Sequence, residues 1–189
     1  KKKNYLDYFI FINFFFFFII SAGPPTMADA LDYNYGVAKY LINFSDWPPV
    51  SLWLHGGIAG LGEVYSSLGL FLYTDNLGGI IQSLSLIFFC IFLSSELNNE
   101  NHSKFIKLFI ISSPVIIFLV SGPKFQLFPQ ILTSTALFLI LKKKKIDLNE
   151  FLIISVLLMG ATQFKLSFLI SGLPIGILAI FRLNKKNFN

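Results

Sequence analysis

Apolar residues occur along this sequence in long runs that are separated by short polar stretches. The first run covers residues 9–22 and is interrupted only by Asn13. Five later runs are candidates for further membrane-embedded helices, and they cover residues 77–93, 105–120, 127–141, 151–162 and 166–181. Several are shorter than the about 20 residues that span a hydrocarbon core, so we expect tilt, local thinning or burial by neighbouring helices. The last two runs can alternatively form a broken re-entrant pair.

The segment between the first two runs has a different pattern, because glycines, prolines and charged residues interrupt its apolar positions. Pro24 and Pro25 stop any helix that arrives from the first run, since proline lacks a backbone donor and restricts the residue before it. A new helix is expected over 28–41, and apolar residues at spacings of three and four predict an amphipathic helix over 51–72. We therefore predict a long loop that lies along the membrane surface.

The composition places the chain among integral membrane proteins. Apolar residues make up 54% and charged residues 13% of the sequence, whereas about 25% of a typical soluble domain is charged. The mean hydropathy is +0.69. The predicted fold class is all-α, a polytopic membrane helical bundle with about six spans and a long outer first loop that contains amphipathic helices. Residues 1–189 are expected to form a single transmembrane domain.

The two ends of the sequence bear on this expectation. Lys1 stands at the first position and a basic tail ends at Asn189, which predicts the amino-terminal part of a longer protein. The charged start, the first apolar run and Ser21-Ala22-Gly23 are also compatible with a cleaved signal peptide. A retained first helix is the simpler interpretation, because several further apolar runs follow.

The distribution of cations predicts the orientation in the membrane. If the amino terminus lies inside, the inner segments hold most of the cations, namely Lys1, Lys2, Lys3, Lys104, Lys107, Lys142, Lys143, Lys144, Lys145, Arg182, Lys185 and Lys186. The outer segments hold only Lys39, Lys124 and Lys165. This asymmetry follows the positive-inside rule, so we expect a multi-pass protein of the bacterial inner (plasma) membrane with a cytoplasmic amino terminus. Topology accounts for the four-lysine run, and no nucleic-acid partner is expected.

Candidate functional residues gather on the predicted outer side. In a helix over 28–41, Asp29 and Asp32 are three positions apart and share a face with Tyr33. Lys124 and Lys165 lie in short outer turns, where cations run against the positive-inside rule. An anionic partner such as a lipid phosphate would account for both lysines, and so would snorkelling to the headgroups of the bilayer.

Short motifs in and after the first loop resemble a known family. They are Pro24-Pro25-Thr26, Asp29-Ala30-Leu31-Asp32-Tyr33, Trp53-Leu54-His55-Gly56, Gly60-Leu61-Gly62-Glu63 and Pro123-Lys124. Together they are similar to membrane glycosyltransferases of the GT-C superfamily, and more closely to bacterial dolichyl-phosphate-mannose-protein mannosyltransferase-like proteins. The first outer loop of those proteins often contains Asp-Ala-x-x-Tyr-His, and Asn34 stands in the place of the histidine.

The resemblance implies an enzyme that transfers a sugar from a polyprenyl-phosphate donor to an acceptor on the outer, periplasmic face, with inversion. Asp29 is then expected to act as general base, while Asp32 either holds the acceptor hydroxyl or forms with Asp29 a weak Mg²⁺ or Mn²⁺ site. Lys124 and Lys165 would meet the donor phosphate. The other substrate-binding residues that the resemblance implies are Tyr33, His55 and Glu63.

Other functions stay open on the sequence alone. A non-catalytic membrane transporter, or an accessory subunit of envelope glycan assembly, would use the outer charges to line a path. Transport sites tend to lie near the middle of the membrane, whereas the acids here cluster in an outer loop, which favours surface chemistry. An inactive fragment is a further interpretation. The sequence contains no zinc-ligand spacing, phosphate-binding loop, nucleophile elbow or dinucleotide fingerprint.

Overall fold

Helices make up the regular structure of the chain. The computed structural model describes residues 5–25, 33–49, 51, 59–97, 99–122 and 124–183. Within these ranges the helices are α1 (Tyr5–Ser21), α2 (Tyr35–Phe44), α3 (Leu61–Phe71), α4 (Leu77–Glu96), α5 (Glu100–Ile111), α6 (Pro114–Val120), α7 (Leu127–Lys142), α8 (Leu148–Phe164) and α9 (Phe168–Arg182). An isolated parallel bridge joins Ile146 to Leu183. The predicted all-α class is confirmed for the described residues.

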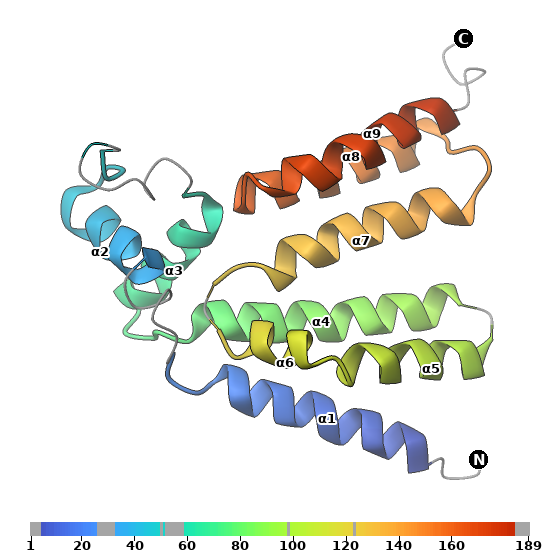
Figure 1. Ribbon diagram of the computed structural model, residues 1–189, viewed down its shortest axis with the longest axis horizontal. Helices are drawn as coiled ribbons and strands as arrows, with labels where there is room; N and C mark the ends of the chain where they lie inside the picture. Colours follow the sequence, from blue (N-terminus) through green and yellow to red (C-terminus); the bar gives the residue numbers. More distant parts are fainter. Residues whose placement is uncertain are drawn as a thin grey trace.

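The long helices lie side by side, and the two ends of the bundle differ (Figure 1). α2 and α3 gather at one end together with the turns before α7 and α9, and we call this the α3 end. The start of α1, the end of α9 and the connections from α4 to α5 and from α7 to α8 lie at the opposite end, which we call the terminal end. Because the chain crosses the bundle repeatedly, residues far apart in the sequence meet at each end.

Two clusters of buried apolar side chains hold the bundle together. The first is built from α1, α4, α5, α6 and α7, and its members are Ile10, Phe17, Leu86, Ile111, Val120, Leu127 and Ile131. The second joins α7, α8, α9 and the connection before α8, and its members are Ala136, Ile140, Ile146, Ile154 and Ala179. α7 contributes to both clusters, so it is the element that links the two halves of the bundle.

A glycine lets α4 start deep between its neighbours. A Cβ atom at Gly79 would lie 2.7 Å from the carbonyl oxygen of Ser21 and 3.3 Å from that of Val120. Any larger residue would push apart the ends of α1 and α6, which fixes how closely α4 approaches both.

One predicted span is broken. The apolar run 105–120 was expected to be continuous, but α5 and α6 are bent by 67° at the break between them. Pro114 is the first residue of α6, where its missing N–H and its restriction of the preceding residue end the helix that arrives. The expectation of one straight helix over this run is wrong for that reason.

The second helix expected in the first loop is shorter than the pattern predicted. α3 begins at Leu61 rather than near residue 51, because Gly60 is extended and the side chain of Glu63 accepts a hydrogen bond from the backbone N–H of Gly60 at this point. Residues 26–32 and 52–58 lie outside the described residues, so the expected start of a helix near residue 28 is untested. α2 runs to Phe44, and Ser45 follows it in the left-handed conformation.

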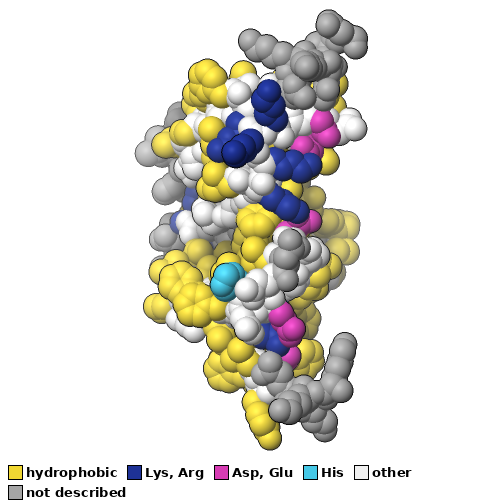
Figure 2. Space-filling view, turned by 90° about the vertical axis from the view of Figure 1, so that its right-hand side faces the viewer, with side chains coloured by type: hydrophobic (Ala, Val, Ile, Leu, Met, Phe, Trp, Pro, Cys, Tyr) yellow, Lys and Arg dark blue, Asp and Glu magenta, His cyan; other side chains and the backbone are white. Residues whose placement is uncertain are grey.

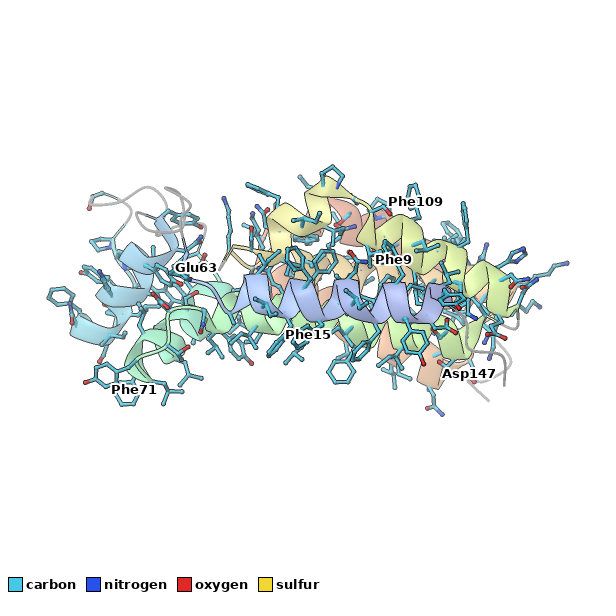
Figure 3. The ribbon with its side chains drawn as sticks, turned by 90° about the horizontal axis from the view of Figure 1, so that it is seen from below. Phe9, Phe15, Glu63, Phe71, Phe109 and Asp147 are labelled. Atoms are coloured by element: carbon cyan, nitrogen blue, oxygen red, sulfur yellow. The ribbon has the colours of Figure 1, made fainter. Side chains whose placement is uncertain are left out.

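The sides of the bundle are apolar and exposed. Among the described helices, α4 is long and apolar enough to cross a membrane, and α5 with α6 passes the same test as a bent pair. The other apolar helices, α1, α7, α8 and α9, have 15 to 17 residues, or about 25 Å at the longest, against about 30 Å of hydrocarbon. Phe15 and Phe109 are 60% and 75% exposed on the flanks of the bundle (Figure 3). Such a surface indicates association with a membrane.

Candidate functional site

Four of the residues singled out in the sequence come together at the α3 end. Tyr33 precedes α2, Glu63 lies in the first turn of α3, Lys124 precedes α7, and Lys165 lies between α8 and α9. We call them the two-lysine cluster. The other predicted site residues, Asp29, Asp32 and His55, lie outside the described residues.

Glu63 is placed by the start of its own helix. Its Oε2 accepts a hydrogen bond of 2.7 Å from the backbone N–H of Gly60, and the residue is only 9% exposed. A Cβ atom at Gly60 would lie 2.6 Å from the carbonyl oxygen of Gln163 and 2.8 Å from that of Phe164. The absence of a side chain at Gly60 therefore lets α3 begin directly against the end of α8, next to Lys165. Figure 3 shows Glu63 where α2 and α3 meet the bundle.

Opposing effects act on the pKa of the Glu63 carboxyl group. Burial raises its pKa, whereas the N–H groups of Gly60 and Glu63, the charge of Lys165 and the hydroxyl of Tyr33 each act to lower it. The same burial, together with the charge of Glu63 and the hydrogen bond to it, raises the pKa of Tyr33 to about 12. Tyr33 therefore keeps its proton near neutral pH and donates it in a hydrogen bond to Glu63.

Two cations share the same space. The Nζ of Lys124 lies 5.8 Å from the centroid of the Tyr33 ring, a distance at which a cation is attracted to the face of an aromatic ring. Burial lowers the pKa of Lys165 and repulsion by Lys124 lowers it further, whereas the charge of Glu63 acts in the opposite direction. An anion placed near both ammonium groups would remove this repulsion.

Gln82 fixes the turn that carries Lys124, although nothing in the sequence analysis singled it out. Its Nε2 donates to the carbonyl oxygens of Leu119 and Gly122 at 3.0 and 2.6 Å. Its Oε1 accepts from the backbone N–H groups of Gln126 and Leu127 at 3.0 and 2.8 Å. The side chain is completely buried in α4, so every donor and acceptor position of the amide ties down the chain on either side of Lys124.

The signal that could have revealed Gln82 is a single amide within an apolar run. Polar side chains inside membrane helices are rare and usually have a specific partner. Gln82 follows Ile80 and Ile81 and is therefore visible in the sequence as such an exception.

Two further contacts attach the first loop to the bundle. The hydroxyl of Tyr35 donates to the carbonyl oxygen of Asp75, and Asn76 Nδ2 donates to that of Ala22 at 2.6 Å. Asn34, in contrast, is 2% exposed and its amide nitrogen has no hydrogen-bond partner among the described residues. A buried donor of this kind costs about 1–3 kcal/mol unless something pairs with it.

A groove adjoins the two-lysine cluster. It lies between α6, α7 and the start of α9, has a volume of about 470 Å³, and we call it the α6–α9 groove. Its lining is Val115, Ile116, Leu119, Gln126, Leu127, Gln130, Lys165, Ser167 and Phe168. Lys165 therefore belongs both to the charged cluster and to a mainly apolar groove.

The predicted metal site is not tested by the described residues. Within them no group of three or more His, Cys, Asp or Glu side chains comes together. Asp29 and Asp32, the pair expected to bind Mg²⁺ or Mn²⁺, lie outside that part of the chain.

These features define an all-helical, membrane-associated bundle with a cationic site at one end. The chain belongs to the DUF1420 N-terminal domain family, which matches residues 1–188. No significant match was found among curated proteins or among solved structures.

Proposed function

We propose that the chain is the amino-terminal membrane domain of a GT-C-type glycosyltransferase. The enzyme would move a sugar from a polyprenyl-phosphate donor to an acceptor on the outer face of a bacterial inner membrane, with inversion. The observation that carries the proposal is the meeting of Lys124 and Lys165, one of them lining an apolar groove, at a single end of an apolar bundle. A phosphate attached to a lipid chain has the charge and the hydrocarbon that such a site accommodates.

A multi-pass topology of about six spans accompanies this proposal. The exposed apolar flanks of α1, α5 and α9 support it, because exposing so many phenylalanine and isoleucine side chains to water would be unfavourable, whereas a lipid bilayer accommodates them. The charges support a cytoplasmic amino terminus. Lys104, Arg182 and the run 142–145 lie at the terminal end, whereas Lys124 and Lys165 lie at the α3 end, which would face outward.

The reaction follows from the chemistry of the donor. The acceptor oxygen attacks the anomeric carbon while Asp29 takes the hydroxyl proton, and the bond from that carbon to the phosphate oxygen breaks with its electron pair. The lipid phosphate departs with one more negative charge than it had in the donor. Lys124 and Lys165 stabilise this developing charge. Asp32 would hold the acceptor hydroxyl or, with Asp29, contribute to a weak Mg²⁺ or Mn²⁺ site.

The experiment measures sugar transfer in membranes that contain the full-length protein. Radiolabelled polyprenyl-phosphate sugars are supplied to wild type, to Asp29→Asn and to Asp46→Asn, with expression matched. Asp46 is the control because it is an exposed acid whose Oδ1 accepts from the N–H of Trp47. We expect Asp29→Asn to lower the rate at least about 100-fold, the usual contribution of a general base.

The other outcomes are equally informative. Equal rates in wild type and Asp29→Asn would place the base elsewhere. If wild type transfers sugar from none of the donors, the enzyme proposal fails and a transporter or accessory subunit becomes the better explanation.

A further inference from the structure

We infer that the α6–α9 groove holds the hydrocarbon chain of a single-chain lipid phosphate whose phosphate binds Lys165, an assignment that rests on the function proposed above. This assignment gives the two lysines of the two-lysine cluster different roles. Lys165 both retains the lipid and stabilises the charge that develops during transfer, whereas Lys124, which does not line the groove, has only the second role.

The groove exists because the third apolar run is broken. α6 starts at Pro114 and is bent by 67° from α5. A space lined by apolar side chains therefore remains between α6 and the start of α9. Val115 and Leu119 from α6 face the groove together with Phe168 from α9. A continuous helix over this run would not present the same wall.

The groove has the dimensions and the chemistry of a ligand site. Its volume of about 470 Å³ falls within the roughly 300–1,000 Å³ of typical small-molecule pockets. Its walls are aliphatic and aromatic, and Val115 is 61% exposed at its rim. It therefore opens onto the flank of the bundle, where the surrounding surface is also apolar, so a hydrocarbon chain can enter sideways from a bilayer.

Polar groups are confined to a few positions of the lining. They are the ammonium of Lys165, the amides of Gln126 and Gln130, and the hydroxyl of Ser167. An ammonium supported by neutral donors suits a phosphate monoester, which accepts several hydrogen bonds and carries up to two negative charges. Burial and Lys124 already lower the pKa of Lys165, and a bound phosphate would reverse that effect.

The charge distribution favours a phosphate over a neutral lipid, and the shape favours one chain over two. Burial and the charge of Lys124 both lower the pKa of Lys165, and a phosphate, unlike a neutral headgroup, brings a negative charge that acts against both effects. A single groove of this volume takes one chain lengthwise, whereas a bilayer phospholipid brings two.

The experiment uses photolabelling of the purified full-length protein in nanodiscs. The probe is geranylgeranyl monophosphate with a diazirine in its chain, and labelled positions are mapped by peptide mass spectrometry. Geranylgeraniol carrying the same diazirine tests the headgroup. Phosphatidylglycerol serves as the competitor that tests for ordinary bilayer lipid.

Matched variants test the groove and the lysine separately. Val115→Trp obstructs the groove at an exposed position, and Val156→Trp on α8 makes the same change at a similarly exposed residue, 69%, outside the groove. Lys165→Gln removes the proposed phosphate contact, while Lys39→Gln removes an exposed lysine of α2.

We expect label on α6, α7 and the start of α9, and about tenfold less of it in Val115→Trp and in Lys165→Gln than in their controls. Equal labelling of Val115→Trp and Val156→Trp, equal labelling by the alcohol and the phosphate, or full competition by phosphatidylglycerol would each overturn the inference. If the label appears as expected in a protein that transfers no sugar, the groove binds a lipid phosphate but the glycosyltransferase proposal fails. If Val115→Trp is not labelled but transfers sugar at the wild-type rate, the glycosyltransferase proposal stands and the assignment of the groove fails.

Discussion

At the terminal end of the bundle three lysines, Lys104, Lys142 and Lys143, form ion pairs with carboxylates, whereas at the α3 end the charge of Lys124 acts against that of Lys165. Lys104 lies 3.1 Å from a carboxylate oxygen of Asp7 and 2.6 Å from one of Glu100. The terminal end also contains the ion pairs Lys142–Glu96 and Lys143–Glu150. Figure 2 shows the lysines and arginine of this end interspersed with acidic side chains.

The α3 end uses its charges differently. The carboxylate of Glu63 accepts hydrogen bonds from the N–H of Gly60 and from the hydroxyl of Tyr33. Its negative charge is also attracted to the ammonium group of Lys165. Lys124 adds a further cation. The comparison indicates that ion pairs at the terminal end join neighbouring helices, whereas at the α3 end two lysines lie near one buried carboxylate, where we propose that a phosphate binds.

The largest expected effect is on stability and comes from Gln82. Gln82→Leu leaves two buried carbonyl oxygens and two buried N–H groups without their partner, so we expect a loss of about 3 kcal/mol or more in the free energy of unfolding. Denaturant unfolding in detergent measures it. Gln163→Leu, at an exposed position, is the control and should change the stability little. A small effect of Gln82→Leu would show that the turn around Lys124 is held by other contacts.

The second prediction separates the two ends directly. Lys104→Gln, at the terminal end, should lower the melting temperature while leaving geranylgeranyl phosphate labelling unchanged, because it breaks contacts to Asp7 and Glu100. Lys165→Gln should lower labelling about tenfold while leaving the melting temperature equal or higher, since it removes a partly buried cation beside another. If both variants change the same property, the distinction between the ends is wrong.

The third prediction concerns the dependence of stability on pH. The pKa of Glu63 is raised in the folded protein above its ordinary value of 4.5, so its folded state binds a proton more tightly than the unfolded chain does. Its contribution is complete below pH 4.5 and is lost as the pH rises through the raised value. Glu63→Gln should flatten this decline in a series of melting temperatures, since the amide oxygen of glutamine can still accept the hydrogen bond from the N–H of Gly60.

Glu150→Gln provides the comparison at the terminal end, because Glu150 is paired with Lys143. That variant should keep the wild-type decline over the same pH range. An identical profile for wild type and Glu63→Gln would mean that burial of Glu63 is compensated.

The smallest effect is expected from the helix caps. Asp147 Oδ1 accepts a hydrogen bond of 2.8 Å from the N–H of Glu150, so Asp147→Ala should cost about 1 kcal/mol. Asn34 occupies the cap position of α2 without a side-chain cap bond, and Asn34→Ala should cost clearly less. Chemical denaturation of both variants measures the difference. A larger loss for Asn34→Ala would reveal a partner of its buried amide.

Much of the bundle could be predicted from its apolar runs. The runs 77–93 and 127–141 correspond closely to α4 and α7, because long uninterrupted apolar segments leave little freedom for other structure. The run 151–162 missed the start of α8, since Asp147 and Glu150 form a polar capping box outside the apolar pattern. The break at Pro114 was not predicted, because Pro114 lies inside an apolar run and proline is tolerated in membrane helices.

The meeting of the four described candidate residues at one end was predicted, but their arrangement was not. Tyr33, Glu63, Lys124 and Lys165 were expected on one side, because alternating helices bring their loops to the same end. No periodic signal indicates that Tyr33 bonds to Glu63, or that Gln82 supports Lys124, since such contacts depend on how separate helices approach one another. The roles of Asp29, Asp32 and His55 remain predictions.

The place of α7 in both buried clusters has a mechanical consequence. Val115 and Ile116 belong to the half of the bundle built on α1 and α4, whereas Lys165 and Phe168 belong to the hairpin of α8 and α9. The groove therefore lies between two separately packed clusters that α7 joins. A small rotation of one cluster about α7 would widen or narrow the groove while the packing within each cluster stays intact.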